Sequence, residues 1–437
     1  MNQYGLLGEK LGHSFSPVIH KQLWGCDYVL IPIPRDQIDI FFKQRNFSGI
    51  NVTIPYKQVA CNTCEHVDPK AQAIGAVNTV VNQDGILYGY NTDYDGFLYC
   101  ARRAGIDFVD KKVLILGNGG TSLTARNAVA DNGAREIVVI SRSAAPADGA
   151  EHSSADLTVG ITRKCPLRFD TYDRLAAFHS DAEVIINTTP VGMYPNNYAT
   201  PLDLTLFPRL SGVVDVIYNP GTTRLVHTAR RLGIPATCGL PMLVAQAAYA
   251  AAYFSGRTFS DADIELVYKK VLADTSNIVL IGMPGCGKTT VGKALAKTLQ
   301  REVVDVDALI VEREGRPIPE IFANDGEEFF RRCETEATKI AGMKTGVIIS
   351  CGGGLPTRET NHFPMLQNGR IYYLDRSLER LATDGRPLSQ QNRLVDMYEK
   401  RHPIYQNLCH RQIQVVENNL QKMIDEITED FYENIGD

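Results

Sequence analysis

The stretch NIVLIGMPGCGKTTVGKAL, residues 277–295, predicts a buried strand, a glycine-rich turn and the start of a helix. Residues 282–289 fit the pattern G-x-x-x-x-G-K-[ST] at every fixed position, and such a turn cradles nucleotide phosphates. Its backbone N–H groups bind the anion, Lys288 reaches the β- and γ-phosphates, and Thr289 holds Mg²⁺. We therefore predict a nucleotide and Mg²⁺ as ligands. The expected nucleotide contacts are Gly282, Gly285, Cys286, Gly287 and Thr290.

A second glycine-rich turn lies far upstream, in KKVLILGNGGTSLTARNAV, residues 111–129. It fits the dinucleotide pattern G-x-G-x-x-G, except that Ser122 replaces the third glycine. After the next expected strand, Arg142 stands where a fold that binds NAD usually has an acidic residue. A guanidinium there suits the 2′-phosphate of NADP; the alternative is an ordinary solvated loop residue. The predicted cofactor contacts are Gly117, Asn118, Gly119, Gly120 and Arg142.

Length and composition predict a soluble protein of two or three domains. The chain has 437 residues, a net charge of -5 and an isoelectric point near 6.0, which argues against a nucleic-acid or anionic-membrane partner. The most apolar run, residues 239–256, is shorter than the ~20 residues of a spanning helix, and the first residues lack a signal-peptide pattern. We expect a cytoplasmic monomer or small homo-oligomer. Cys61 and Cys64 form the one close cysteine pair, which indicates reduced thiols; a zinc site is the alternative.

Strand-like apolar runs alternate with helical patterns along the chain. They are YVLIPI, KVLILG, EIVVIS, EVIINTT and GVVDVIY in the first part, and NIVLIG, GVIISCGGG and RIYYLD in the second. This alternation predicts the α/β class, with parallel sheets and helices on both faces. A polar stretch with one helical pattern predicts the join between the two parts, and a further boundary lies near Gly105. The expected segments are 1–104, 105–256, the linker 257–276, and 277–437.

Four polar motifs mark the first hundred residues: LGHSFSPVIH, GINVTIPYKQ, GAVNTV and GYNTDYDGF. Taken singly, each is typical of a turn or a helix cap. In this order, and followed by NTTPVGM, DVIYNPGTT and GLPMLVAQA, they resemble shikimate dehydrogenase from about residue 1 to residue 256. The resemblance implies an α/β substrate domain followed by a Rossmann-type NADP domain, with the site in the cleft between them.

The resemblance also implies that Lys57 and Asp93 form a catalytic pair that reduces 3-dehydroshikimate to shikimate with NADPH. The chemistry agrees, because an ammonium stabilises the charge that develops on the ketone oxygen and can supply its proton. A plain salt bridge is the alternative. The implied substrate contacts are Ser14 and Ser16 for the carboxylate, Thr53, Asn78 and Gln246 for the ring hydroxyls, and Tyr218. The implied further cofactor contacts are Thr188, Met193 and Gly239.

Downstream of the turn at residues 282–289, VVDVDALI, NDGEEFFRRCETEA, ISCGGGLP, DGRPLS and YEKRHPIYQ stand in an order that resembles shikimate kinase. The resemblance runs from about residue 277 to residue 437 and implies phosphate transfer from ATP to shikimate. It implies that Asp305 orders Mg²⁺, that Asp307 is the base, and that Arg386 closes from a lid. The implied substrate contacts are Arg331 and Arg401 for the carboxylate, with Gly352, Gly353 and Gly354 beside the ring.

Three positions depart from the two family patterns. Alanines stand beyond Arg142 where a second basic residue is usual, which weakens the NADP assignment. Cys238 precedes Gly239 in place of an acidic residue, which leaves the hydride geometry largely unchanged. The lid before Arg386 is short and lacks a clear second arginine, so it does not define the adenine contact.

Together the resemblances imply a bifunctional enzyme of the shikimate pathway, in which one site makes the substrate of the other. Two alternatives stay open. A quinate/shikimate-type dehydrogenase would prefer NAD, and Arg142 speaks against it. A regulator with decayed sites would bind the ligands without turnover, and the intact Lys57, Asp93 and Lys288 speak against that.

Overall fold

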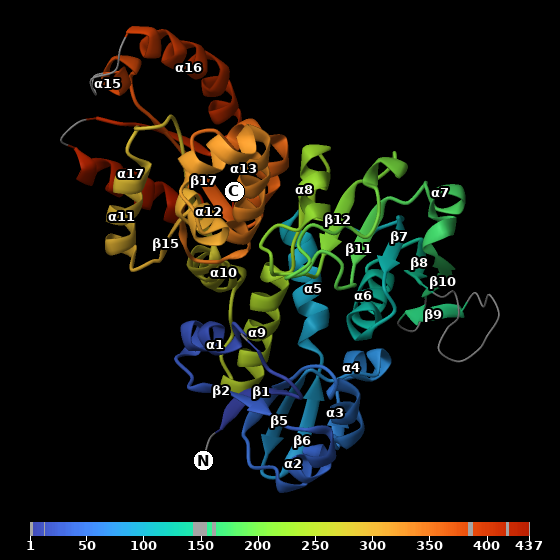
Figure 1. Ribbon diagram of the computed structural model, residues 1–437. Helices are drawn as coiled ribbons and strands as arrows, with labels where there is room; N and C mark the ends of the chain where they lie inside the picture. Colours follow the sequence, from blue (N-terminus) through green and yellow to red (C-terminus); the bar gives the residue numbers. More distant parts are fainter. Residues whose placement is uncertain are drawn as a thin grey trace. The chain divides into compact units, whose positions relative to one another are not determined.

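The computed structural model describes residues 3–12, 14–142, 155–159, 163–382, 388–416 and 419–436. The chain divides into two compact units, which are coloured along the sequence in Figure 1. The first unit comprises residues 1–219 and 223–271, and the second comprises residues 220–222 and 272–437.

The N-terminal sheet of the first unit is mixed. Its strands are β1 (Tyr4–Gly8), β2 (Tyr28–Pro32), β3 (Gly49–Val52), β4 (His66–Val67), β5 (Thr79–Gln83) and β6 (Ile86–Tyr90), in the order β2-β1-β3-β5-β6-β4. β1 pairs in parallel with β2 and β3, whereas β5 pairs antiparallel with β3 and β6. The expectation of parallel pairing missed the hairpin between β5 and β6. Its two loop residues, Asp84 and Gly85, have φ of 52° and 88°, the left-handed values that a tight hairpin turn requires.

The second sheet of this unit is parallel except at one edge. Its strands are β7 (Lys112–Leu116), β8 (Glu136–Ser141), β9 (Ala155–Val159), β10 (Arg163–Thr171), β11 (Val184–Asn187), β12 (Gly212–Asp215) and β13 (Ala236–Thr237), in the order β13-β12-β11-β7-β8-β10-β9. Among the described strands of this second sheet, only the pair β9–β10 is antiparallel. The chain order reverses at β7, so the carboxyl ends of β7 and its neighbours are the expected place for a dinucleotide.

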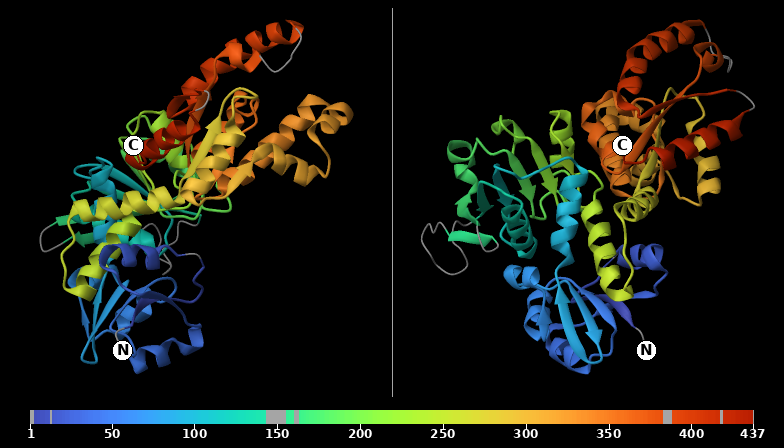
Figure 2. Two further views of the ribbon diagram at one scale, coloured as in Figure 1. Left: turned by 90° about the vertical axis from the view of Figure 1, so that its left-hand side faces the viewer. Right: turned by 180° about the vertical axis from the view of Figure 1, so that it is seen from behind.

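Helices α5 and α9 lie side by side in the first unit, as all views show (Figures 1 and 2). The helices of this unit are α1 (Ser16–Trp24), α2 (Ile38–Gln44), α3 (Lys57–Thr63), α4 (Pro69–Ile74), α5 (Thr92–Arg103), α6 (Gly120–Asp131), α7 (Leu175–Phe178), α8 (Arg224–Arg231), α9 (Leu240–Ser255) and most of α10 (Asp261–Thr275). Gly96 allows the close packing, because a Cβ there would lie 2.9 Å from Cβ of Gln246. The expected linker contains α10, which an Arg103–Glu265 pair at 2.8 Å ties to α5.

The second unit is built on a fully parallel sheet. Its strands are β14 (Asn277–Ile281), β15 (Val303–Asp305), β16 (Ile348–Ser350), β17 (Gly369–Asp375) and β18 (Arg411–Gln414), in the order β15-β16-β14-β17-β18. Its helices are α11 (Lys288–Leu299), α12 (Val306–Glu314), α13 (Ile318–Met343), α14 (His362–Leu366), α15 (Leu378–Ala382), α16 (Leu388–Leu408) and α17 (Leu420–Glu433). The central strand β14 is buried along its length and runs directly into the glycine-rich turn at residues 282–287.

The α/β class with parallel sheets is confirmed. All eight quoted apolar runs contain strands, and the alanine-rich run at residues 239–256 forms the packed helix α9. In the described ranges, no helix is both long enough and apolar enough to cross a membrane. The same ranges contain no cluster of potential metal ligands around Cys61 and Cys64, which are free thiols.

Candidate active sites

The ion pair expected in the first unit is formed. Nζ of Lys57 lies 2.5 Å from Oδ2 of Asp93, and the two side chains are only 23% and 16% exposed. Lys57 begins α3, after a turn in which the N–H of Tyr56 donates to the carbonyl of Thr53 at 3.0 Å. Asp93 stands in the first turn of α5, where the helix dipole favours a carboxylate. Because an ammonium has three N–H donors, this pair leaves two for a ligand.

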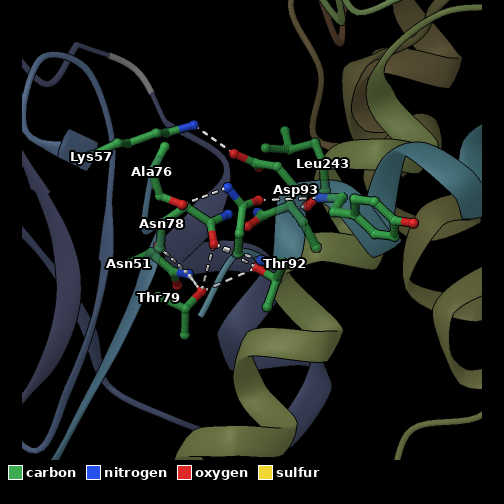
Figure 3. A network of polar contacts seen from close by, with 11 residues as sticks. Asn51, Lys57, Ala76, Asn78, Thr79, Thr92, Asp93 and Leu243 are labelled. Carbon is green, nitrogen blue, oxygen red and sulfur yellow. Dashed lines mark hydrogen bonds and ion pairs between the residues drawn. The ribbon is translucent and has the colours of Figure 1, made fainter. Parts of the chain in front are cut away.

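Asn78 is held in one orientation beside this pair (Figure 3). Its Oδ1 accepts a hydrogen bond from the backbone N–H of Thr92 at 2.7 Å, and the hydroxyls of Thr79 and Thr92 lie 3.1 and 3.2 Å away. Within the described ranges, no group accepts a hydrogen bond from Nδ2 of Asn78. Asn78 therefore presents N–H donors, and its ligand must offer an acceptor.

A one-way chain of hydrogen bonds lies behind Thr79. The indole N–H of Trp24 donates to Nδ1 of His20 at 3.1 Å, and Nε2 of His20 lies 3.2 Å from Oδ1 of Asn51. Since an indole only donates, the neutral His20 carries its proton on Nε2. Nδ2 of Asn51 then donates to the hydroxyl of Thr79 at 3.0 Å and to the carbonyl of Asn78 at 3.3 Å. Burial lowers the pKa of His20 to about 3, which keeps the imidazole neutral.

The other predicted substrate residues fall into two groups. Ser14 and Ser16 have their hydroxyl oxygens 3.2 Å apart at the start of α1. The ring of Phe15, between these serines, contacts the ring of Tyr218 with centroids 5.9 Å apart, so the serine turn and Tyr218 are neighbours. Gln246 lies on the face of α9 that packs against α5, the helix that carries the carboxylate of the ion pair.

The glycine turn after β7 leaves an uncapped helix end. Gly117 has a φ of 98°, and a Cβ there would lie 3.0 Å from Oγ1 of Thr188. Gly119 precedes the first residue of α6, Gly120, and no side chain caps this end. A Cβ built on either Gly119 or Gly120 would have no atom within 4 Å. Such an open, positively polarised end suits a dinucleotide phosphate.

The remaining predicted cofactor residues lie around the same edge of the sheet. Arg142 is exposed directly after β8, and its neighbour Ser143 lies outside the described residues. Met193 is exposed in the loop after β11. Gly239 directly precedes α9 and lies so close to the backbone of Val216 that a Cβ would collide with the Val216 carbonyl. This close contact explains the glycine.

Asp215 ties several of these loop ends together, a role that the sequence did not reveal. Its carboxylate accepts from Nδ2 of Asn187 at 3.0 Å, from the hydroxyl of Thr223 at 2.7 Å and from the N–H of Ile217 at 3.1 Å. Burial raises the pKa of Asp215 to about 7, although the hydrogen bonds from the three donors lower it. Through these hydrogen bonds, Asp215 holds together the loops that follow β11 and β12.

In the second unit, the turn at residues 282–289 folds around the ammonium group of Lys288. Its Nζ donates to the carbonyls of Gly282 at 2.9 Å and Met283 at 3.0 Å. The hydroxyl of Thr289 lies 3.4 Å from Oδ2 of Asp305, which also caps the start of α12. The predicted nucleotide turn and metal residues are thus brought together.

The three consecutive glycines after β16 face the predicted substrate residues. A Cβ on Gly352 would lie 2.8 Å from Oδ1 of Asp307, and a Cβ on Gly354 would collide with the guanidinium of Arg331. Arg331 pairs with Glu334 at 2.8 Å, and the side chain of Glu334 is only 1% exposed. Burial, and then the charge of Asp305, raise the pKa of Asp307. The glycines are therefore needed for space rather than for a turn.

The same glycines connect the substrate residues to the nucleotide turn and to α16. A Cβ on Gly353 would lie 2.8 Å from Cδ of Pro284 in the turn. The hydroxyl of Tyr405 donates to the carbonyl of Gly353, and Arg401 hydrogen-bonds to the same hydroxyl, which lowers the pKa of Tyr405 against the larger effect of burial. Arg386, the expected lid residue, lies outside the described residues.

Sequence reasoning assigned no role to four further residues of these sites: Asn51, Thr79, Thr92 and Glu334. All four nevertheless lie in the motifs quoted above. Glu334 was detectable, because it follows Arg331 by three positions on the same helix face. Thr92 was detectable as the neighbour of Asp93 at a helix start. Nothing in the local sequence marks Asn51 or Thr79 as partners of distant side chains.

Two families match the chain. The family described as shikimate dehydrogenase substrate binding domain matches residues 6–80, and the family of shikimate kinases matches residues 284–432. The NADP(+)-dependent shikimate dehydrogenase of Clostridium perfringens strain SM101 is 33% identical over 279 residues, covering 62% of this chain and 98% of that protein.

Solved structures agree with the dehydrogenase match. The shikimate 5-dehydrogenase of Thermus thermophilus, in complex with NADP(H) and shikimate, aligns with a TM-score of 0.53 and 30% identity over 62% of this chain and 99% of that chain. A chorismate mutase/shikimate 5-dehydrogenase fusion protein from Clostridium acetobutylicum aligns with a TM-score of 0.55 and 32% identity, over 62% and 97% of the two chains.

Proposed function

The chain belongs to the shikimate dehydrogenase family over its first part and carries a shikimate kinase domain in its last part, and we propose that it performs two successive reactions. It is a bifunctional enzyme of the shikimate pathway. The first site reduces the C3 ketone of 3-dehydroshikimate, and the second phosphorylates the hydroxyl group so formed. The observation that carries the proposal is that one chain contains both the Lys57–Asp93 pair and a nucleotide turn joined to Asp307 by the glycines after β16.

In the reduction, Lys57 acts on the oxygen of the substrate ketone. The hydride that reaches the ketone carbon comes from NADPH. As negative charge develops on the oxygen, the ammonium of Lys57 stabilises it by hydrogen bonding and then transfers the proton that completes the hydroxyl group. Asp93 holds the ammonium in place at 2.5 Å, and Lys57 afterwards recovers a proton from solvent.

The substrate is held by groups on both sides of this pair. Ser14 and Ser16 bind its carboxylate through their adjacent hydroxyls. Asn78 donates from Nδ2 to a ring oxygen, since its Oδ1 is already occupied by protein donors. The further contacts are Thr53, Gln246 and Tyr218.

The first unit fits a dinucleotide because the N-terminus of α6 is uncapped and no side chain crowds Gly119 or Gly120. We assign the pyrophosphate to Gly117–Gly120 with Asn118, and the 2′-phosphate to Arg142. Thr188, Met193 and Gly239 would line the nicotinamide side.

In the kinase reaction, Asp307 accepts the proton of the shikimate hydroxyl as that oxygen attacks the γ-phosphorus of ATP, whose bond to the β,γ-bridging oxygen breaks to release ADP. The raised pKa of Asp307 suits this role, because it makes the carboxylate a stronger base. Lys288 neutralises charge on the transferred group, with Arg386 as the expected second cation. Arg331 and Arg401 hold the substrate carboxylate, and the glycines after β16 admit its ring.

The oxygen atoms of Thr289 and Asp305 fit Mg²⁺. They lie 3.4 Å apart beside the nucleotide turn, and Mg²⁺ prefers such hard ligands shared with phosphate oxygens. These two residues would hold the metal, which supplies charge neutralisation at the phosphates.

We divide the chain into residues 1–104 for the substrate domain, 105–256 for the NADP domain, 257–276 for the join and 277–437 for the kinase domain. The attachment of α10 to α5 through Glu265 indicates that most of the join folds with the dehydrogenase. A dehydrogenase that ends at residue 256 should therefore be less stable than one that ends at residue 271.

The test is a single cuvette with the full chain. Addition of 3-dehydroshikimate should cause NADPH absorbance to fall, and later addition of MgATP should release ADP. Lys57→Met should abolish NADPH oxidation and spare phosphorylation of added shikimate, whereas Lys288→Met should do the reverse. Binding of all ligands without either signal would show a regulator instead, and loss of both activities in either variant would refute independent sites.

A further inference from the structure

Arg126 is a buried cation for which the described residues supply no counter-ion. It lies in the middle of α6 and is only 6% exposed. Its Nε has no hydrogen-bond partner, and its one hydrogen bond to a described residue runs from Nη2 to Oδ1 of Asn118. Burial alone, with no neighbouring carboxylate, lowers the pKa of Arg126 to about 10. A charge in this state is costly unless an anion joins it.

The guanidinium of Arg126 lies over the carboxyl-terminal part of β8. On one side it contacts Asn118, in the glycine turn that follows β7. On the other it stands 5.1 Å from the centroid of the Phe169 ring on β10. Phe169 pairs with Val139 of β8, and β8 lies between β7 and β10 in the sheet. Because the guanidinium of Arg126 contacts both Asn118, which follows β7, and Phe169 of β10, it must lie across β8.

The end of this strand is where a Rossmann-type fold receives the adenosine ribose, and where a basic residue accommodates a 2′-phosphate. The only basic residue directly at this end among the described residues is Arg142, which is exposed. A second polar group supports the same interpretation: Ser122, one helical turn before Arg126, is fully buried, and its hydroxyl also has no partner among the described residues. Helix α6 thus presents two unsatisfied polar groups on one face beside an uncapped N-terminus.

We propose that Arg126 binds the 2′-phosphate of NADP together with Arg142, and so supplies the second cation that the sequence lacks after β8. The proposal rests on the NADPH-dependent reduction proposed above. Arginine suits the role because the N–H groups of its planar fork match two phosphate oxygens at once. Asn118 accepts from one N–H of Nη2. The N–H of Nε, which shares an edge of the fork with Nη2, has no partner among the described residues and is left for the ligand.

The test compares NADPH with NADH in the full chain. Arg126→Met removes the charge and keeps most of the side-chain volume. It should raise the KM for NADPH by about tenfold or more, as expected for one charge-assisted contact, and change the KM for NADH less than about threefold. Arg168→Met is the matched control: Arg168 precedes Phe169 on β10, its side chain points to the opposite face, and it pairs with Glu136 at 3.2 Å.

Arg126→Lys keeps the charge but loses the fork, so its KM for NADPH should lie between those of the unchanged chain and of Arg126→Met. This variant, together with titration of nicotinamide fluorescence by each dinucleotide, also decides the question if Arg126→Met does not fold. An unchanged KM for NADPH in both variants would overturn the proposal. Equal losses for NADPH and NADH would overturn it too, and would assign Arg126 to the pyrophosphate or to packing. A chain that oxidises neither cofactor would instead refute the proposed function.

Discussion

The two nucleotide turns of this chain solve the same task in different ways. In the kinase turn, Gly282, Gly285 and Gly287 all have positive φ, and Lys288 lies within the same segment. In the dehydrogenase turn only Gly117 has positive φ. The cations proposed for its ligand come from the middle of a helix and from the end of another strand. The kinase turn carries its binding groups locally, whereas the dehydrogenase turn depends on residues that the fold brings to it.

The largest effect should come from adding a methyl group to each turn. Gly287→Ala forces an alanine to φ of 103°, so the kinase turn must deform, and kcat/KM for ATP should fall about 100-fold. Gly119→Ala adds a Cβ that has no protein atom within 4 Å, so the KM for NADPH should rise only about three- to tenfold. Each variant keeps the other activity as its internal control, and equal losses in the two variants would remove the contrast.

The kinase base should give the next effect. Because burial raises the pKa of Asp307, kcat/KM for shikimate should begin to fall, about tenfold per pH unit, at a higher pH than an ordinary carboxylate would allow. Arg331 lowers this pKa, so Arg331→Met should move the acid limb to still higher pH. The pH profile of each variant measures this limb apart from any change in KM. A limb that stays in place would show that another group titrates.

In the dehydrogenase part, a change of pH should act on stability, through the buried residue His20 behind the site. His20 has a folded-state pKa of about 3, below its unfolded value near 6.5, so the unfolded chain binds the extra proton. The contribution of His20 to the free energy of unfolding is complete above pH ~6.5 and is lost as pH falls. Between pH 7 and 5, the free energy of unfolding of the first unit should fall by about 2 kcal/mol.

Trp24 is the single tryptophan of the chain, so its fluorescence during urea unfolding reports this unit alone. None of the groups that contact the His20 ring gains a proton in this range; they are Trp24, Tyr28, Asn51 and Phe254. His20→Gln should therefore unfold with less dependence on pH than the unchanged chain. An identical dependence would show that the imidazole does not titrate on unfolding as we expect.

The smallest effect should come from Cys286→Ala. The side chain of Cys286 is buried, with Sγ 3.8 Å from Nζ of Lys288. In a turn of this kind, backbone N–H groups and not a thiol bind the phosphates. Kinase activity should change less than about threefold. A loss above tenfold would mean that the local side chain, and not only the backbone, sets the position of Lys288.

The same contrast explains how much could be predicted from the sequence. The kinase turn, its strand and its helix are contiguous, so their pattern was sufficient. The pairing of Lys57 with Asp93 was predictable only through a family resemblance, since 36 positions separate them. The hairpin at Asp84 and Gly85 had a local signal that the general expectation of parallel sheets obscured.

Other features had no local signal at all. Arg126 looks like any helical arginine until its burial and its contact with Asn118 are known. The series of hydrogen bonds from Trp24 through His20 to Asn51 joins α1 to β3. Which group donates in each hydrogen bond is known only once the contacting atoms are known. Such long-range contacts depend on packing, which periodicity does not encode.

The occupied oxygen of Asn78 also limits which inhibitors this enzyme can accept. A shikimate analogue with an ammonium group at the ring position next to Asn78 would set donor against donor and bind poorly. An analogue with fluorine or a carbonyl there would keep an acceptor and bind better. Comparing the inhibition constants of such a pair would test this difference, and equal constants would mean that Asn78 can reverse its amide.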